Sequence, residues 1–346
     1  MAAGLPSNPL KKIQLVRPAH VWYKHKDIEA AKRFAADFGF YETETIGKTT
    51  FFRGYGTEPF VLALEASDKP EFGGAAFVVE SEEDLVYAHQ SLPKECRATE
   101  VHELKDVPGG GKRVTFYDPV DGFPFHLVHG QTEVERRDPG FPVLKFNYPN
   151  EKNREPNKFQ RFEKRPAPVH KLGHFGMCVT NFAKCYEFYS TYFNFHPSEV
   201  RILRMKRLLA ERLTNSFQLV HNDEGVDVTV FFRLDRGKEF VDHHCFFFFE
   251  GPKMHVHHSS FETHDFDAQV LGHDWLRHQG YTNCWGVGRH VMGSQIFDYW
   301  FDPSNFILEH YVDGDLLDMN EPTHHNKAAP DNLHVWGPEV PPTFLQ

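Results

Sequence analysis

The chain has 346 residues, enough for two domains that each bury a core. Its 40% hydrophobic and 25% charged residues are typical of a folded globular protein, and its longest apolar run, residues 245–249, is too short to cross a membrane. The net charge of -10, with no basic tract, leaves no electrostatic footprint for nucleic acid and favours small-molecule chemistry.

The cysteines and the N-terminus both bear on the cellular compartment. The 5 cysteines are scattered and form no C-x-x-C pair, which argues against a disulfide framework or a thiolate metal site. The first residues show no basic start followed by an apolar core, so no secretory signal is apparent. We therefore expect a cytoplasmic protein.

Two segments share one plan, in which a strand headed by histidine is followed by a polar N-cap and an amphipathic helix. The first begins at His20 with Asp27 as its cap, and the second begins at His174 with Asn181 as its cap. A second repeat pairs residues 77–92 with residues 261–276, and each copy leads to a strand that ends in Asp-Pro. The chain is therefore predicted to be an internal duplication of four strand-helix-strands modules in two pairs.

Composition divides the chain further. Residues 1–130 form the predicted N-terminal domain, and residues 169–315 the predicted C-terminal catalytic domain. Between them, residues 131–168 are charged and punctuated by proline, which indicates a linker. Residues 316–346 are rich in Pro, Asn and His, and we expect an extended surface tail without elements.

Three strands of the second half carry side chains that can bind a metal. Strand alternation places His174, His258 and Glu309 on one concave face. Two imidazoles and one carboxylate on one face of an octahedron leave positions open for substrate and oxygen, an arrangement that suits non-haem iron(II).

Any single histidine among 23 is more often a surface or core residue than a ligand. These three residues differ from the other histidines and acids because they occupy equivalent strand positions of a repeated unit, and because the first half lacks the set. His20 matches His174 there, but Gly74 stands where His258 would be and His126 takes the carboxylate position. We therefore expect no metal in the N-terminal domain.

The strand around His174 and residues 254–261, 286–290 and 299–309 resemble the type I extradiol ring-cleaving dioxygenases of the vicinal oxygen chelate superfamily. The likeness is strongest to catechol 2,3-dioxygenase and trihydroxytoluene oxygenase-like enzymes. It covers nearly the whole chain as architecture and is specific from about His174 to Asp315. It implies an α+β fold of four βαβββ modules in two domains, each a curved, mixed β-sheet closed like a barrel into a funnel.

The resemblance also implies roles for individual residues. The metal ligands would be His174, His258 and Glu309, holding Fe(II), with Mn(II) as the alternative. The catalytic residues would be Tyr299, His290 and His244, of which His244 is the acid-base group; its neighbour His243 is the other candidate for that role. Further residues expected at the substrate are His243, Phe248, Trp285 and His257.

The implied activity is cleavage of a di- or trihydroxylated aromatic ring by O2, which gives a muconic semialdehyde-type product. The partners would be the catecholic substrate and O2, in a dimer or tetramer, with neither nucleic acid nor membrane involved. Three alternatives remain: a non-redox metalloenzyme of the glyoxalase type, a hydroxyphenylpyruvate-type dioxygenase, and a metal-free binding protein of the bleomycin-resistance type. A complete triad within one half argues against a glyoxalase-type enzyme, which usually shares its ligands between module pairs. A metal-free binding protein would have no need of two histidines and one glutamate in this arrangement.

Overall fold

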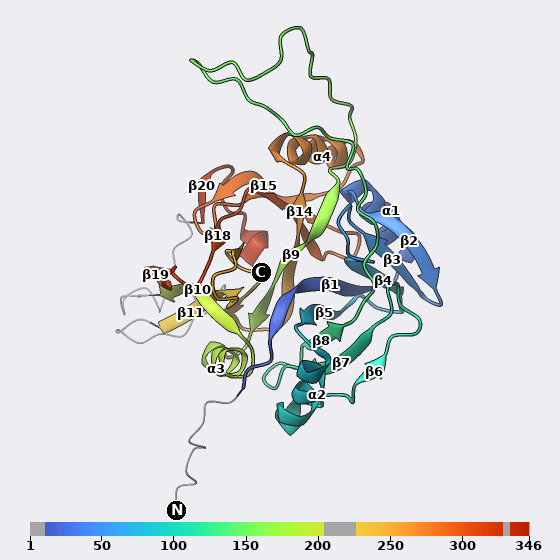
Figure 1. Cartoon of the computed structure of the whole chain (residues 1–346), viewed down its shortest axis with the longest axis vertical. Helices are drawn as coiled ribbons and strands as arrows, with labels where there is room; N and C mark the ends of the chain where they lie inside the picture. Colours follow the sequence, from blue (N-terminus) through green and yellow to red (C-terminus); the bar gives the residue numbers. More distant parts are fainter. Residues whose placement is uncertain (1–10, 204–225, 328–332, 346) are drawn as a thin grey trace, which may run out of the picture.

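The computed structural model describes residues 11–203, 226–327 and 333–345 (Figure 1). The first sheet has the strand order β2-β3-β4-β1-β5-β8-β7-β6. Its strands are β1 (Leu15–His25), β2 (Tyr41–Ile46), β3 (Thr49–Arg53), β4 (Leu62–Ala66), β5 (Glu71–Val79), β6 (His102–Glu103), β7 (Lys112–Tyr117) and β8 (Pro124–His129). Helix α1 (Ile28–Phe38) follows β1, and helix α2 (Glu82–Ser91) with the short turn η1 (Lys94–Cys96) follows β5.

The second sheet repeats this plan in the order β19-β10-β11-β13-β9-β14-β17-β16-β15-β20. Its strands are β9 (Val169–Val179), β10 (Phe195–Leu203), β11 (Val226–Leu234), β13 (Phe246–Glu250), β14 (His255–Thr263), β15 (Asn283–His290), β16 (Ile296–Phe301), β17 (Ile307–Val312), β19 (His324–Lys327) and β20 (His334–Trp336). Helix α3 (Phe182–Tyr192) follows β9, and helix α4 (Phe266–His278) follows β14. The short strands β12 (Val241–Asp242) and β18 (Leu316–Leu317) pair with each other.

The predicted α+β fold of four repeated modules is confirmed. In each sheet two modules meet at an antiparallel central pair, β1 with β5 and β9 with β14. The helix caps also lie where the sequence placed them, since Asp27 accepts a hydrogen bond from the Ala30 N–H and Asn181 accepts one from Lys184. The two halves therefore share both the strand order and the equivalent positions at which their helices begin.

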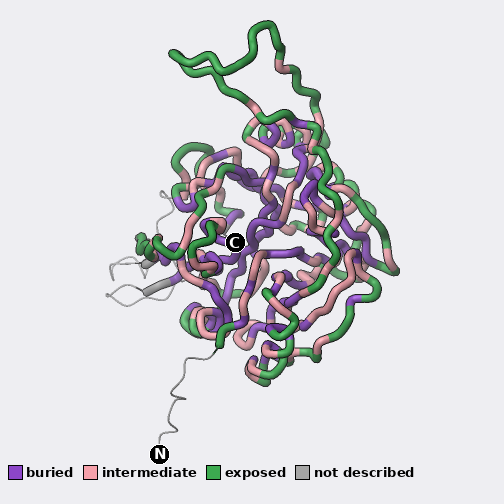
Figure 2. Tube along the Cα trace, in the orientation of Figure 1, coloured by how far each residue is buried: buried purple, intermediate pink, exposed green. Residues whose placement is uncertain are grey.

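The two sheets share one continuous apolar core. Phe175 of β9 packs against Phe77 of β5 and Phe125 of β8, with ring centroids 5.8 and 5.7 Å apart. The Tyr23 hydroxyl of β1 lies 2.7 Å from the Ser259 hydroxyl of β14, and both residues are buried. Figure 2 shows buried residues concentrated along these central strands. The halves therefore stabilise each other rather than standing as separate bodies.

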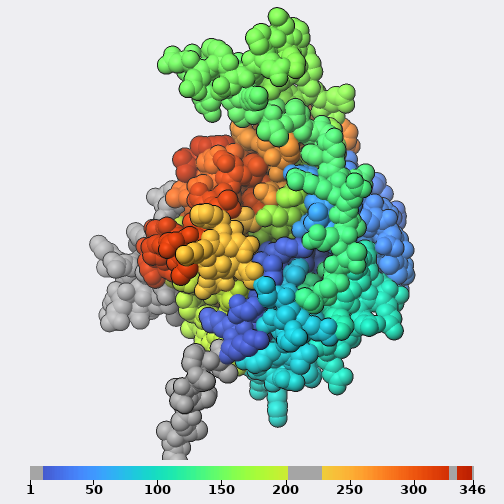
Figure 3. Space-filling view, viewed as in Figure 1, coloured from blue at the N-terminus to red at the C-terminus, as the bar shows by residue number. Residues whose placement is uncertain are grey.

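Residues 131–168 form no helix or named strand and contain one isolated bridge, Asn147 to Lys152. Part of this segment stands out from the surface as a green lobe (Figure 3), whereas the backbone N–H groups of Val134 and Arg137 donate to the carbonyls of Thr57 and Tyr55. Among the described residues, no helix is both long and apolar enough to cross a membrane.

The prediction for the C-terminal tail was wrong. Residues 316–345 form β18, β19, β20 and the turn η3 (Pro342–Leu345) in their described parts. Strand β19 pairs with β10 and β20 pairs with β15. Both partners would otherwise be edges of their modules, with unpaired backbone groups that a passing segment can satisfy. The tail therefore completes the second sheet.

Asp302 closes the turn between β16 and β17. Its Oδ1 accepts hydrogen bonds from the backbone N–H groups of Ser304 and Phe306, and its Oδ2 lies 3.8 Å from Nδ1 of His25. Burial raises the pKa of Asp302 to about 7, even though these two backbone donors favour its ionised form.

Candidate metal centre

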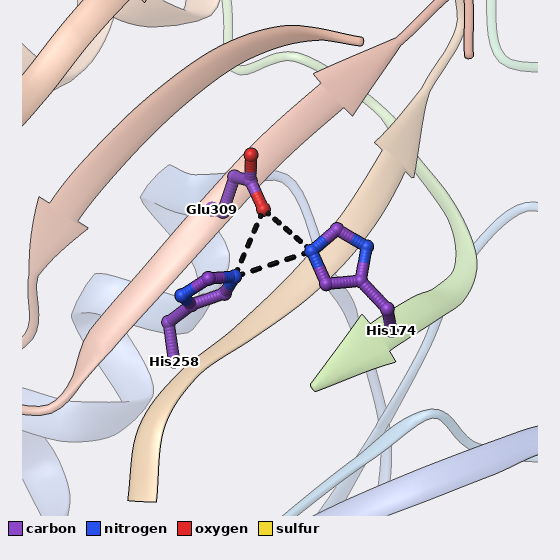
Figure 4. A group of neighbouring side chains, drawn as sticks. All are labelled: His174, His258 and Glu309. Atoms are coloured by element: carbon purple, nitrogen blue, oxygen red, sulfur yellow. Dashed lines mark hydrogen bonds and ion pairs between the residues drawn. The ribbon is translucent and has the colours of Figure 1, made fainter. Parts of the chain in front are cut away.

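Three adjacent strands bring His174, His258 and Glu309 together (Figure 4). Strand β14 lies between β9 and β17, and its Ser260 is paired with His174 on one side and Glu309 on the other. His258 lies two residues before Ser260 and therefore shares its face. Because the Ser260 side chain is small, the imidazole and the carboxylate can meet above it.

The three donor atoms are spaced as metal ligands are. Nε2 of His174 lies 3.1 Å from Oε2 of Glu309 and 3.2 Å from Nε2 of His258, which is 3.3 Å from the same oxygen. Ligands at about 2.1 Å from an ion and at right angles to each other are about 3.0 Å apart. The three residues therefore fit one ion on one side of its coordination sphere.

The electrostatics of this group also favour a cation. Burial alone would raise the pKa of the Glu309 carboxyl, but the two imidazoles of His174 and His258 outweigh it and hold the pKa well below its usual range. Neither carboxylate oxygen meets hydrogen-bond geometry with a donor in the described part of the chain. A buried carboxylate in this state needs a compensating charge, which a divalent ion would supply.

The first sheet does not assemble an equivalent set. His126 is engaged with the Thr115 hydroxyl and the Gly73 carbonyl. At Gly74, a Cβ would lie 2.7 Å from Nε2 of His126, so no ligand side chain fits there without a shift.

His244 lies beside His174 of this group. Its ring centroid lies 4.2 Å from that of His174, and its Nδ1 lies 3.1 Å from Nδ1 of His243. His243 is turned toward Glu199, with Nε2 3.7 Å from Oε1. Both histidines lie in the loop between β12 and β13. Burial, with the neighbours His174 and His243, holds the pKa of His244 well below its usual value.

Tyr299 and His290 form a second pair beside Glu309. Tyr299 of β16 is paired with Glu309 of β17. The Tyr299 hydroxyl lies 2.9 Å from Nε2 of His290. The same nitrogen of His290 lies 3.9 Å from Oε1 of Glu309. Burial lowers the pKa of His290 to about 4, so this imidazole is neutral near pH 7. Its Nδ1 donates to the Leu333 carbonyl, at 2.9 Å, which leaves Nε2 to accept the Tyr299 hydroxyl proton.

Two of the residues expected at the substrate are placed differently. Phe248 packs in the core against Phe182 and Tyr189. Its neighbour Phe247 instead faces the three ligand candidates His174, His258 and Glu309, called the metal group below, and its ring centroid lies 5.0 Å from that of His258. Phe247 is paired with Gly176 of β9, where a Cβ would lie only 1.7 Å from the Phe247 ring. The absent side chain at Gly176 thus makes room for the phenyl ring.

His257 does not face a substrate space either. Its Nδ1 lies 2.8 Å from Nδ1 of His258, and its Nε2 lies 2.5 Å from the Phe344 carbonyl. It therefore contacts His258, one of the three ligand candidates, through the ring nitrogen that faces away from Glu309. Trp285 stacks on Tyr299 at 5.8 Å, and its indole N–H donates to the Pro338 carbonyl.

Two residues near the centre were missed from the sequence. Tyr311 lies two residues after Glu309 and so shares its face; its ring is 5.6 Å from that of His174, and its buried hydroxyl has no hydrogen-bond partner among the described residues. Strand alternation could have identified it. Phe344 gave no such signal, because the tail carries no strand or helix periodicity.

A cleft of about 800 Å³ lies away from the metal group. Its lining comes from both sheets, includes Trp22, His126 and Val256, and contains none of the three ligand candidates. This cleft therefore does not include the candidate metal site.

Comparisons with known proteins agree with this architecture. No protein-family model matches the sequence. Metapyrocatechase 2 of Cupriavidus necator is 32% identical over 126 residues, which are 36% of this chain and 38% of that relative. The matched stretch is thus well under two thirds of the relative's length.

Solved structures match almost the whole chain. The Mn(II)-bound glyoxalase from Novosphingobium aromaticivorans has a TM-score of 0.74 at 21% identity, over 96% of this chain and 94% of its own. The homoprotocatechuate 2,3-dioxygenase of Brevibacterium fuscum, in complex with 3,4-dihydroxyphenylacetate, has a TM-score of 0.73 at 18% identity, over 99% and 95%. The chain has the vicinal oxygen chelate fold. Within this fold it resembles an extradiol dioxygenase in part of its sequence.

Proposed function

We propose that the protein is an extradiol dioxygenase that opens the ring of a catechol-type substrate with O2, using one iron(II) ion held by His174, His258 and Glu309. The observation that carries the proposal is the convergence of three donor atoms within 3.3 Å of one another on one sheet face. Two imidazoles and one carboxylate with open positions suit non-haem iron(II), which favours iron over manganese. The sequence likeness to a metapyrocatechase supports the same chemistry.

Iron(II), when bound, supplies a centre that can hold the two substrate oxygens and O2 together, which O2 chemistry on an aromatic ring requires. His244 takes a proton from the substrate hydroxyl and later returns it, a task that suits an imidazole. Because Nδ1 of His244 faces His243, the proton exchange uses Nε2.

Tyr299 holds a substrate oxygen. Its own proton is directed to His290, so the phenolic oxygen presents its lone pairs to a substrate hydroxyl. This pair is fixed before the substrate arrives, and preorganised polar groups of this kind stabilise developing charge without reorganisation. Phe247 and Phe344 provide the apolar surfaces that exclude water from the ring.

A non-redox reaction of the glyoxalase type is the second candidate, because the Mn(II)-bound glyoxalase structure matches the chain over nearly its full length. The two candidates differ in their need for O2. A glyoxalase-type isomerase rearranges a thiol adduct without consuming oxygen, whereas ring cleavage consumes one O2 for each ring.

The test is O2 uptake by anaerobically purified chain loaded with Fe(II) or Mn(II), using catechol, alkylcatechols and trihydroxybenzenes. We expect equimolar O2 uptake and a yellow open-chain product with the Fe(II) protein. His258→Ala should lose metal and activity, and His255→Ala, on the same strand but outside the group, should keep both. No O2 uptake by metal-loaded protein on any of these compounds would exclude the proposal.

A further inference from the structure

The C-terminal turn η3 seats Phe344 directly beside the metal group. Its ring centroid lies 4.7 Å from that of Tyr299 and 6.3 Å from that of His258, on which it stacks at 28°. Phe344 is only 6% exposed, although it lies close to the end of the chain. The last residues therefore belong to the site.

A chain of hydrogen bonds joins this turn to a ligand. The Phe344 carbonyl can only accept, so Nε2 of His257 carries a proton and donates to it, at 2.5 Å. If His257 is neutral, its Nδ1 is a lone pair, and Nδ1 of His258 must donate to it across 2.8 Å. The proton of His258 then sits on Nδ1, and Nε2 turns its lone pair toward Glu309 and His174.

The opposite arrangement would block metal binding. A doubly protonated His257 would have to donate to Nδ1 of His258, which would place the His258 proton on Nε2, the atom that faces the other two ligands. The backbone carbonyl of residue 344 therefore selects the metal-binding tautomer of His258 through His257. His174 has no such support, since its Nδ1 is buried without a hydrogen-bond partner among the described residues.

We propose that the C-terminal turn is a structural part of the metal centre. Phe344 and His257 are positioning residues: the carbonyl holds His257, His257 fixes the orientation and tautomer of His258, and the Phe344 ring closes one wall of the substrate space. Partners of this kind behind a ligating histidine typically contribute 10–100-fold to metal affinity. The inference rests on the proposed function only in taking His258 as a metal ligand.

The carbonyl and the ring can be tested separately. A chain ending at Pro341 removes both, Phe344→Ala removes the ring alone, and Thr343→Ala is a matched control, because Thr343 is an exposed residue of the same turn. The dissociation constant for Mn(II) or, anaerobically, Fe(II) is measured by chelator competition, without any assay of activity. We expect the truncation to weaken metal binding about 10–100-fold. Phe344→Ala should leave metal binding near that of the full chain and raise KM for a catechol, and Thr343→Ala should change neither.

The decisive comparison repeats the truncation in a His257→Phe background. If the turn acts through His257, His257→Phe alone should weaken metal binding by a similar factor, and the truncation should then add nothing. Equal losses with and without His257, or no loss at all, would overturn the inference. A full chain that holds metal but cleaves no ring would overturn the proposed function and leave this inference standing, whereas a full chain that holds no metal would overturn both.

Discussion

Replacing His244 by Asn, with His243→Asn as the matched control, separates two neighbouring histidines that differ in what they face. The His244 ring lies 4.2 Å from the His174 ring, whereas His243 is directed toward Glu199. Neither is among the three convergent donors, so both variants should retain the metal. Asn fits the space of either imidazole but cannot act as a proton-transfer group near neutral pH.

The expected magnitude follows from the role of His244. A positioned acid-base group contributes about 10²–10⁴-fold, which corresponds to roughly 3–5 kcal/mol of activation free energy. His244→Asn should therefore lower kcat for an ordinary catechol by this factor. His243→Asn removes only the partner of Nδ1 and should lower kcat far less.

The assay is single-turnover ring cleavage at matched iron content, first with an unsubstituted catechol and then with an electron-poor catechol already ionised at the assay pH. The electron-poor substrate should lose less in His244→Asn, because it needs less help from a base. A slow His243→Asn beside a near-normal His244→Asn would refute the reasoning, as would an equal loss for both substrates.

Three further predictions concern the metal count and the stability of the fold. The chain should bind one metal ion, by elemental analysis, and two tightly held ions would contradict the argument from Gly74. Tyr23→Phe should cost about 1–3 kcal/mol of unfolding free energy in denaturant melts, because it removes a buried partner of Ser259; addition of Ser259→Ala should cost little more, and full additivity would contradict the coupling. Folded Asp302 keeps its proton up to about pH 7, whereas an unfolded aspartate releases it near pH 4, so its contribution to stability falls as the pH rises from about 4 to 7. The free energy of unfolding of Asp302→Asn should therefore exceed that of the parent at pH 8 by up to about 4 kcal/mol, and should not exceed it at pH 4. The control Asp68→Asn, at an exposed position, should show no such dependence on pH.

Local signals explain why the fold and the three ligand candidates could be predicted from the sequence. The caps Asp27 and Asn181 lie at the same distance from a histidine in the preceding strand, so the repeat is visible without any long-range information. His174, His258 and Glu309 lie on strands, where alternation predicts the face of each side chain.

The errors arose where alternation fails or where the partner is remote. Residues 246–249 are all phenylalanine, so their sequence cannot say which ring faces inward; pairing of Phe247 with Gly176 decides it. His243 and His244 lie in a loop, where no period applies. The tail strands form by pairing with β10 and β15, and Phe344 is placed by its contact with His257; all of these partners are far away in the sequence. The tail is also polar, so its short strands show no hydrophobic alternation.

The most direct test of ring cleavage is the fate of the oxygen atoms. The iron-loaded chain is given a catechol under ¹⁸O2, and the open-chain product is weighed by mass spectrometry, with rapid trapping of the aldehyde to prevent exchange with water. The account predicts that both atoms of one O2 enter the product and that His258→Ala forms none. A product without ¹⁸O, or with one labelled atom after trapping, would contradict a dioxygenase.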